Sequence, residues 1–424
     1  MSIHTRLGLA LILCAAATVP LAAQAQQDSL EERLEKAEEA IQRLQREIES
    51  QAQSAVQSRL QNRVQISGLV LFNLFYDGAK FNNADVPEWV AGAQDTTGRP
   101  NSQIGGALRQ TRLGITVRPG KVLGGDLSGD LQLDFFGAGG GVDAYARLFS
   151  PPRIRTANVR IDWPHLGLLV GQDKAIVAQQ SPVSFAAIGY PEFAGAGNLW
   201  NWIPQARLTA ETGTSFRVGL QAAALDPLWE PDAFLTAPDL GERSGRPAVE
   251  GRLYLDWGTD EKESTIGFGA HRGWIATAGS GSIASQALTA DFHVVIGVVS
   301  LAGEAFSGQV LNMLGDGGIE QDLGPLGQPV RSRGGWAQLD IRPTFAWEFG
   351  GGYGRDDPTD GDLLQSPSAF APGARLLNVV YEGHLHWRPG GGLLVGAEFR
   401  RFETTFAAGA LKANHVNGFV GVFF

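Results

Sequence analysis

The sequence has almost no cysteine. Among its 424 residues the only one is Cys14, which lies in a leader, residues 1–25, with a basic start, the apolar run LGLALILCAAATV and an A-x-A site at Ala23–Ala25. This pattern predicts a cleaved secretory signal peptide. The run is too short to span a bilayer, and the bulky Leu13 argues against a lipoprotein site at Cys14. We therefore expect a mature protein without cysteine, which excludes disulfides as a source of its stability.

Other absences narrow the function. The formal net charge is −10, so the chain lacks the excess of basic residues that a nucleic-acid binder needs for a polyanionic partner. Hydrophobic residues make up 43 %, and nothing in the composition indicates a helical membrane protein. No glycine-rich phosphate loop is expected between a strand and a helix, because no helix is expected to follow any strand.

Proline and glycine are also absent from residues 28–61, within the segment 26–61 that follows the leader. Apolar residues recur there three and four apart, a heptad pattern with Ile at position a and Leu at position d in its middle. So short a helix is marginal alone, so we expect it to self-associate as a coiled coil. This a/d pattern favours a dimer, and a helix packed on its own domain is the alternative. The seam consists of Leu30, Leu34, Ala37, Ile41, Leu44, Ile48, Gln51 and Ala55.

From residue 63 onward the apolar pattern has a period of two, which indicates β-strands. In LSGDLQLDF, four apolar side chains alternate with Ser128, Asp130, Gln132 and Asp134. Many such segments have the 9–11 residues of a tilted membrane strand. Sixteen are predicted, over residues 63–76, 107–118, 127–136, 153–162, 166–172, 204–211, 215–225, 247–257, 264–274, 287–296, 299–306, 333–341, 344–354, 374–387, 393–402 and 413–424.

The connections between these segments alternate in length, as the short periplasmic turns and longer external loops of outer-membrane barrels do. Tryptophans beside the turns, among them Trp347 and Trp387, have the placement of an aromatic girdle. The strands of a soluble β-sandwich also alternate apolar and polar residues. A sandwich does not explain the alternating lengths of the connections or the placement of the tryptophans. We predict an all-β fold, a 16-stranded antiparallel transmembrane β-barrel over residues 62–424, with an N-terminal periplasmic coiled-coil helix. The long connections are 77–106, 137–152, 173–203, 226–246, 275–286, 307–332, 355–373 and 403–412.

The last segment, HVNGFVGVFF, ends at Phe424 without a polar tail. An unpaired strand edge in hydrocarbon is prohibitive, so we expect this segment to pair with the first strand and close the barrel. Sixteen crossings place both ends of the barrel on the same side, with the coiled coil in the periplasm.

A barrel of sixteen strands is wide enough for an aqueous channel. Alternation places charges of both signs in its lumen. A β-bulge would reverse the facing of these side chains, and the facing is ambiguous around Arg109, Arg112, Arg153 and Arg155. For any one charge the alternative to a pore-lining role is a structural ion pair across the wall. The predicted pore-lining residues are Arg112, Asp134, Arg160, Arg207, Arg217, Arg252 and Arg400. Further predicted lumen acids are Asp130, Asp162, Glu211, Glu250, Asp256, Glu304, Asp340, Glu348, Glu382 and Glu398.

The third long connection, residues 173–203, is rich in small residues, and its only charges are Asp173, Lys174 and Glu192. We expect it to fold inward as a constriction loop, since a narrowing lined by charge is how channels select. The alternative is an external loop that covers a neighbouring subunit.

The order of leader, short coiled coil and sixteen strands resembles the DcaP-like porins of Gram-negative outer membranes. The stretches that carry the resemblance are ISGLVLFNLFYD, ALRQTRLGITV, GDLSGDLQLDFFG, LGLLVGQDKA and GFVGVFF. It implies a homotrimer embedded in outer-membrane lipid, a periplasmic coiled coil, and passive uptake of small organic anions such as dicarboxylates. It also implies that Arg112 in QTRLG faces the solute, and that Phe424 is an assembly signal for the barrel-assembly machinery.

Three other interpretations stay open. The coiled coil favours an envelope tether that binds a periplasmic partner. A barrel-borne hydrolase would use an outward pair, Ser300 and His293, on neighbouring strands. His384 and His386 share a strand face, but a metal site needs further ligands. We predict no enzymatic activity, no cofactor and no metal.

Overall fold

The computed structural model describes residues 63–92, 101–137, 147–228, 238–259, 262–277, 281–364 and 373–424. The predicted signal peptide and coiled coil lie outside these residues. Within them, no helix has the length and apolar character needed to cross a bilayer.

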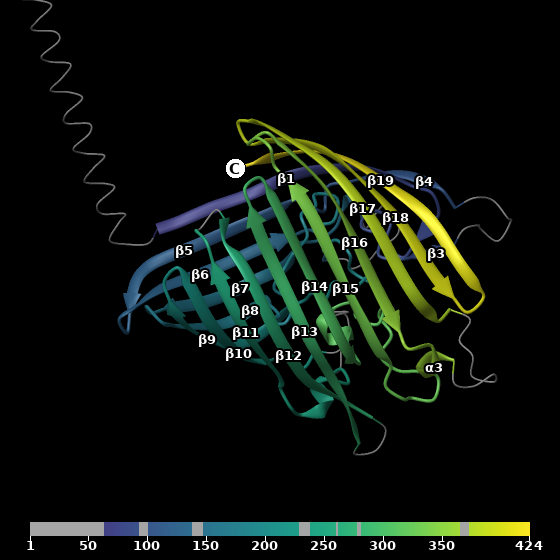
Figure 1. Ribbon diagram of the computed structural model, residues 1–424, viewed down its shortest axis with the longest axis horizontal. Coiled ribbons are helices and arrows are strands. Elements are labelled where there is room, and N and C mark those ends of the chain that lie inside the picture. Colours follow the sequence, from purple (N-terminus) through teal and green to yellow (C-terminus); the bar gives the residue numbers. More distant parts are fainter. Residues whose placement is uncertain are drawn as a thin grey trace, which may run out of the picture. The chain divides into compact units, whose positions relative to one another are not determined.

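Seventeen of the described strands form one closed antiparallel sheet, and β2 and β3 pair separately (Figure 1). Because β4 and β5 together make one crossing, the barrel has the sixteen crossings predicted. The alternation of apolar and polar side chains favours these strands, because the outward face of each strand meets an apolar surrounding and its inward face meets a polar interior. The strands are β1 (Arg63–Asp77), β4 (Gln103–Ala107), β5 (Arg112–Val122), β6 (Gly125–Asp134), β7 (Arg153–Asp162), β8 (Leu166–Lys174), β9 (Trp202–Gly213), β10 (Phe216–Leu225), β11 (Ala248–Trp257), β12 (Ser264–Ala276), β13 (Ser282–Ile296), β14 (Val299–Gln309), β15 (Arg331–Ile341), β16 (Trp347–Pro358), β17 (Arg375–Gly390), β18 (Leu393–Phe406) and β19 (Gly409–Phe423).

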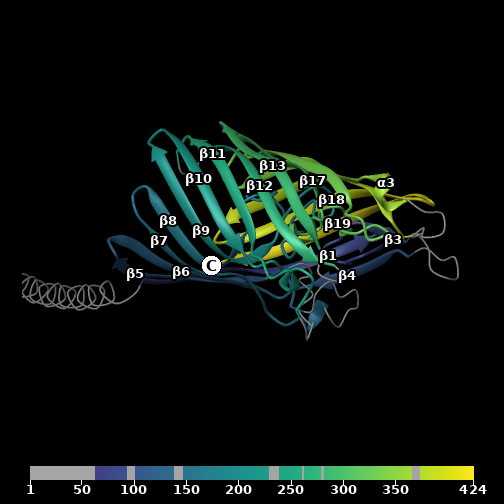
Figure 2. The ribbon, with the colours of Figure 1, turned by 90° about the horizontal axis from the view of Figure 1, so that it is seen from below.

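The last strand closes the barrel against the first. β19 pairs antiparallel with β1 from Leu69 opposite Phe423 to Asp77 opposite His415, and the two strands lie side by side in Figures 1 and 2. The final residue, Phe424, continues this pairing, since its carbonyl accepts a hydrogen bond from the Gly68 amide at 3.0 Å. The predicted closure is confirmed.

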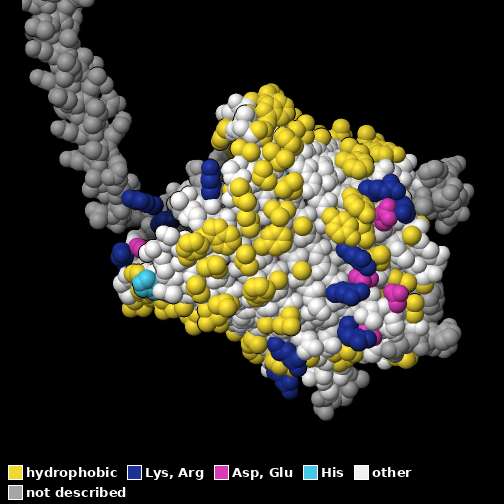
Figure 3. Space-filling view, viewed as in Figure 1, with side chains coloured by type: hydrophobic (Ala, Val, Ile, Leu, Met, Phe, Trp, Pro, Cys, Tyr) yellow, Lys and Arg dark blue, Asp and Glu magenta, His cyan; other side chains and the backbone are white. Residues whose placement is uncertain are grey.

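The outward face carries an apolar belt. Along β1 the outward Val70 is 53 % exposed whereas the inward Leu71 is 0 % exposed. Hydrophobic side chains cover much of the face seen in Figure 3, and charged side chains gather towards the end where α3 (Asp360–Leu363) lies. Beside a short turn, the outward rings of Trp347 and Trp387 stack with centroids 5.9 Å apart. These features are those of a transmembrane barrel.

A β-bulge settles the facing that the sequence left ambiguous. The register of β6 against β7 shifts between Gln132, which lies opposite Thr156, and Leu133, which lies opposite Ile154. An extra residue in one strand reverses the facing beyond it. As a result Ile154 is 49 % exposed on the outward face, and its two arginine neighbours in sequence face inward.

Two predicted long connections, 275–286 and 403–412, are wrong. β12 continues to Ala276 and β13 begins at Ser282, while β18 and β19 are joined across a turn between Phe406 and Gly409. Backbone pairing continues beyond the apolar belt, where the side chains no longer alternate and the pattern cannot be seen in the sequence.

The other long connections hold only short described elements. They are β2 (Lys80–Phe81), β3 (Val90–Gly92), η1 (Glu242–Ser244), η3 (Asn312–Leu314) and α3.

Candidate functional site: the barrel lumen and its third loop

The third loop, residues 175–201 between β8 and β9, is held by inward side chains of the wall. Glu250 of β11 accepts a hydrogen bond from the Ile176 amide at 2.8 Å. Glu304 of β14 accepts one from the Gln180 amide, also at 2.8 Å. The predicted inward facing of these two acids is therefore seen in their contacts, and both bind main chain.

The same pattern continues around the barrel. Gln338 of β15 accepts from the Val183 amide at 2.6 Å and donates to its carbonyl at 3.0 Å. Glu398 of β18 accepts from the Ser184 hydroxyl and the Phe185 amide, each at 2.6 Å, and from the Ala186 amide at 3.2 Å. Hydrogen bonds to a carboxylate are about twice as strong as neutral ones.

Beyond residue 186 the loop reaches the first strands of the barrel. Gln110, between β4 and β5, accepts from the Ile188 amide at 2.6 Å. Arg155 of β7 donates to the Ile188 carbonyl at 2.6 Å, and Arg153 donates to the Gly189 carbonyl at 2.5 Å. The loop thus follows the inner wall, strand after strand, from β11 to β7.

Apolar contacts support the same path. Phe185 and Ile188 of the third loop are buried in one cluster with four inward apolar side chains of the wall. The loop covers these inward apolar residues of the wall. Their contact with the loop explains why apolar side chains occur on the face turned to the lumen. The wall members are Leu69, Leu71, Leu394 and Phe419.

Most of the predicted pore-lining arginines have carboxylate partners. Arg252 contacts Asp291 at 2.6 Å, and Arg400 contacts Glu192 of the third loop at 2.7 Å. Their charges are therefore largely compensated. The remaining pairs are Arg207 with Asp173 at 2.9 Å, Arg160 with Asp162 at 2.7 Å, and Arg217 with Asp256 at 3.3 Å and with Glu263.

A second group of cations, the basic cluster, has an excess of positive charge and consists of Arg112, Arg153, Arg155 and Lys174. Arg153 and Arg155 share one buried carboxylate, Asp134, at 2.7 and 3.0 Å. Within the described part of the chain, neither Arg112 nor Lys174 has a carboxylate at ion-pair distance, and Lys174 Nζ donates instead to a serine hydroxyl at 2.5 Å. Arg112 and Lys174 are close enough to Arg155 to repel it. Among the described residues, this part of the lumen therefore carries positive charge that carboxylates do not fully compensate.

Arg153 and Arg155 were not among the predicted pore-lining residues. The bulge reverses the facing at this point, and alternation alone does not show where a bulge lies. One signal could have found them: two cations flank Ile154, and only the lumen face tolerates two charges at this spacing. The guanidinium of Arg155 lies over the ring of Trp202, 4.1 Å from the ring centroid.

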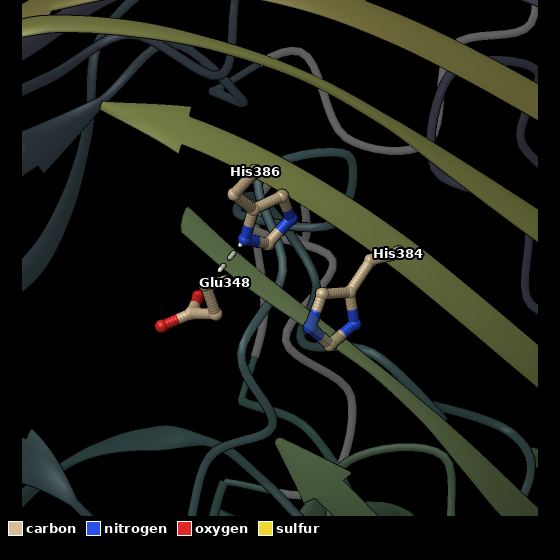
Figure 4. A group of neighbouring side chains, drawn as sticks. All are labelled: Glu348, His384 and His386. Carbon is tan, nitrogen blue, oxygen red and sulfur yellow. Dashed lines mark hydrogen bonds and ion pairs between the residues drawn. The ribbon is translucent and has the colours of Figure 1, made fainter. Parts of the chain in front are cut away.

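The histidine pair lies in a network of carboxylates. His384 and His386, both on β17, stack with ring centroids 4.5 Å apart and an interplanar angle of 17°. Figure 4 shows both rings beside Glu348 of β16, whose Oε1 is 3.0 Å from His386 Nδ1. His386 Nε2 is 3.2 Å from Glu398, and His384 Nδ1 is 2.9 Å from Glu382.

These contacts fit a buried charge network better than a metal centre. The three side chains in Figure 4 place one ligand atom each within 4.8 Å of one another. However, the in-plane lone pairs of parallel stacked rings do not converge on one ion, and metal-bound nitrogens must be free of competing partners. Arg342 and Arg388 also contact Glu348, so its negative charge is compensated.

The predicted hydrolase pair is wrong in its facing. By register, Ser300 shares the inward face of β14 with Glu304, and His293 shares that of β13 with Asp291. No hydrogen bond joins Ser300 to His293 within the described residues. A nucleophile without a base in reach lacks the geometry of acyl transfer.

A buried carboxylate lies where the first long loop meets the sixth. Glu88 is 4 % exposed, and its Oε2 accepts a hydrogen bond from Asn82. Burial raises the pKa of Glu88 well above its usual value, and the negative charges of Asp316 and Glu320 raise it further. The first and third loops are tied to the wall, because Asn378 of β17 donates to the carbonyls of Glu88 in the first loop and of Gly195 in the third, each at 2.8 Å.

Comparison with models of protein families and with curated proteins finds no match. Among solved structures, the chain is similar to the outer membrane channel DcaP of Acinetobacter baumannii, with a TM-score of 0.65 and 15 % identity over 86 % of this chain and 98 % of that one. It is also similar to an anion-selective porin from Comamonas acidovorans, with a TM-score of 0.54 and 14 % identity over 86 % and 100 %. Salmonella typhi OmpF gives a TM-score of 0.52 at 9 % identity over 86 % and 99 %. The chain therefore has the fold of outer-membrane porins, and the predicted resemblance to DcaP-like porins is confirmed at the level of the fold.

Proposed function

We propose that this protein is an outer-membrane porin that lets small hydrophilic solutes diffuse passively, with a preference for small organic anions such as dicarboxylates. The observation that carries the proposal is the unequal compensation of charge in the lumen. The wall acids Glu250, Glu304 and Glu398 are engaged by main-chain amides of the third loop, whereas Arg112 and Lys174 of the basic cluster have no carboxylate partner among the described residues.

In this proposal the third loop narrows the lumen along the wall from β11 to β7, and Arg153, Arg155 and Lys174 of the basic cluster donate hydrogen bonds to it. A solute passes along the loop beside this cluster, whose excess positive charge favours anions and raises a barrier to cations. Arg112 is the first solute-facing residue and Lys174 the second. Asp173 and Glu192, the other predicted charges of the constriction loop, are neutralised by Arg207 and Arg400.

The assembly belongs to the same proposal. The apolar belt and the fold of the similar structures support the outer membrane of a Gram-negative bacterium as the location, with the short turns towards the periplasm. A homotrimer, a periplasmic coiled coil over residues 26–61 and recognition of Phe424 by the barrel-assembly machinery rest on the resemblance stated above.

Reversal potentials in a planar bilayer test the proposal. In a KCl gradient we expect stepwise conductance and a reversal potential of the sign that chloride permeation produces. Replacing KCl with the potassium salt of a dicarboxylate is expected to keep that sign. A cation-selective channel, or no conductance from a correctly folded barrel, would contradict the proposal.

A further inference from the structure

A row of polar side chains crosses the outward face of the barrel beside the apolar belt. By strand register, Arg272 of β12 lies opposite Gln286 of β13, and Gln309 of β14 lies between Gln286 and Arg331 of β15. The row lies near the ends of these four strands that lead into the long loops. Figure 3 shows Lys and Arg side chains in this part of the face, beside the hydrophobic ones.

The next row, closer to the belt, joins a cation to apolar surface. Leu288 of β13 is 69 % exposed and lies opposite Ser307 of β14, which lies opposite Arg333 of β15. Further along β12, the outward Phe268 is 63 % exposed. A ligand that rests here therefore meets guanidinium groups at one end and lipid-facing side chains at the other.

A groove of about 930 Å³ lies along these two rows and is bounded by residues of β16 and α3. Arg272, Arg331 and Arg333 contribute to its lining, together with the exposed Asp360. Of these cations, Arg331 is paired with Asp362 at 2.9 Å. The volume is in the range of sites that hold small molecules or head groups.

The acids of this face leave part of its positive charge accessible. One carboxylate, Asp357, serves both Arg333 and Arg355, at 3.3 and 2.9 Å. Each of these guanidinium groups therefore has donors left for a second anion, because an arginine carries five N–H donors.

Two further arginines meet at Trp274 of β12. The guanidinium groups of Arg246 and Arg272 lie 5.5 and 5.7 Å from the centroid of its ring. Within the described part of the chain, neither arginine has a carboxylate at ion-pair distance, and Arg272 donates instead to the amide oxygen of Gln286. An aromatic ring positions a guanidinium without neutralising it, so both charges are available to an anion.

We propose that Arg246, Arg272 and Arg333 bind the phosphate groups of a phosphorylated lipid in the outer leaflet of the membrane. Guanidinium groups match phosphate oxygens in pairs, and basic clusters at a membrane surface recognise anionic head groups. The acyl chains of such a lipid would cover Leu288 and Phe268, which a free phosphate ion would leave bare. This lipid site is separate from solute passage and rests only on the outer-membrane location proposed above, with the long loops outside.

Native mass spectrometry tests the site on the full-length protein in mixed micelles that contain lipid A with two phosphates. We expect one retained lipid A per chain, no retention of the dephosphorylated form, and no displacement by a hundredfold excess of inorganic phosphate. The double variant with Arg246→Gln and Arg272→Gln is expected to bind lipid A at least tenfold more weakly. Retention is measured without current, so the result does not depend on the selectivity of the channel.

The matched control is the double variant with Arg401→Gln and Lys412→Gln. It also removes two cations, but both are paired with Glu403, at 3.2 and 2.9 Å, away from the groove, and we expect lipid A binding to change less than twofold. The heat-dependent gel shift confirms that each variant is folded. Equal weakening in the two double variants, or displacement by inorganic phosphate, would overturn the proposal. Dissociation of the oligomer without loss of lipid would also overturn it, because a second copy of the chain would then cover this face.

Discussion

At the scale of single residues, Arg112 and Arg217 show how surroundings decide what an arginine does. Both face the lumen by register, and both were predicted as pore-lining. Arg217 is held by Asp256 and Glu263, so its positive charge is more than balanced by two carboxylates. Arg112 has no carboxylate at ion-pair distance among the described residues and adds its charge to those of Arg153 and Arg155.

We expect Arg112→Ala to lower the ratio of anion to cation permeability roughly twofold to fivefold, because removing one unit charge near the solute path changes its energy by about 0.5–1 kcal/mol. The measurement is the reversal potential in a KCl gradient. Arg217→Ala is the control and is expected to change the ratio by less than half as much on the logarithmic scale. Equal shifts in the two variants would contradict the role given to the basic cluster.

At the scale of elements, the third loop and the wall form one unit. Amides of the loop bind Glu250, Glu304, Gln338 and Glu398 in the order in which β11, β14, β15 and β18 follow around the barrel. Glu398 is the central attachment, because it also contacts His386 and Arg400. Its loss would release the middle of the loop.

We predict that Glu398→Ala raises single-channel conductance and current noise while the barrel still folds. Each lost charge-assisted hydrogen bond costs about 1.5–3 kcal/mol, which is enough to let residues 184–186 leave the wall. Planar-bilayer recordings give the conductance, and the heat-dependent gel shift checks folding. Glu403→Ala, on the same strand but paired with the exposed Lys412, is expected to leave the conductance unaltered, and an equal rise there would argue against the anchoring role.

The elements that could be predicted from the sequence are those whose signal lies in the strand itself. All sixteen crossings have an alternating core, as β6 and β11 show, because the apolar belt requires it. The bulge at Arg155 of β7 does not show in alternation itself and leaves only the indirect signal of two cations around Ile154. The turn between Phe406 and Gly409 could not be predicted, since backbone pairing outside the belt places no demand on side chains. Likewise, the pairing of wall acids with loop amides depends on contacts more than 70 residues apart in sequence.

At the scale of the whole molecule, the barrel completes its sheet without the N-terminal segment. Strand β1 pairs with β19 on one side and with β4 and β5 on the other, so the sheet of described strands closes on itself. Closure removes the open edge that hydrocarbon would not tolerate.

Deleting residues 28–61 is expected to leave a heat-modifiable barrel with unaltered conductance per channel, and to lower the temperature at which the oligomer dissociates on a semi-native gel. The reason is that the predicted coiled coil would add association energy, whereas the described strands close the barrel among themselves. The control is Leu34→Asp with Ile41→Asp, which spoils the apolar seam while keeping the segment. If the deletion instead abolishes binding to a periplasmic partner and leaves the oligomer unaffected, the result would support the envelope tether in place of oligomerisation.

Because the barrel wall binds the third loop largely through its main-chain amides, the path of the loop depends on few of its side chains, chiefly the buried Phe185 and Ile188. Pore width and chemistry could then diverge between homologues, or be redesigned, by exchanging the other side chains of residues 176–188 while the path of the loop is kept. The selectivity of such a channel would then depend on two separate sets of residues: the wall side chains that fix the path of the loop, and the loop side chains that face the solute.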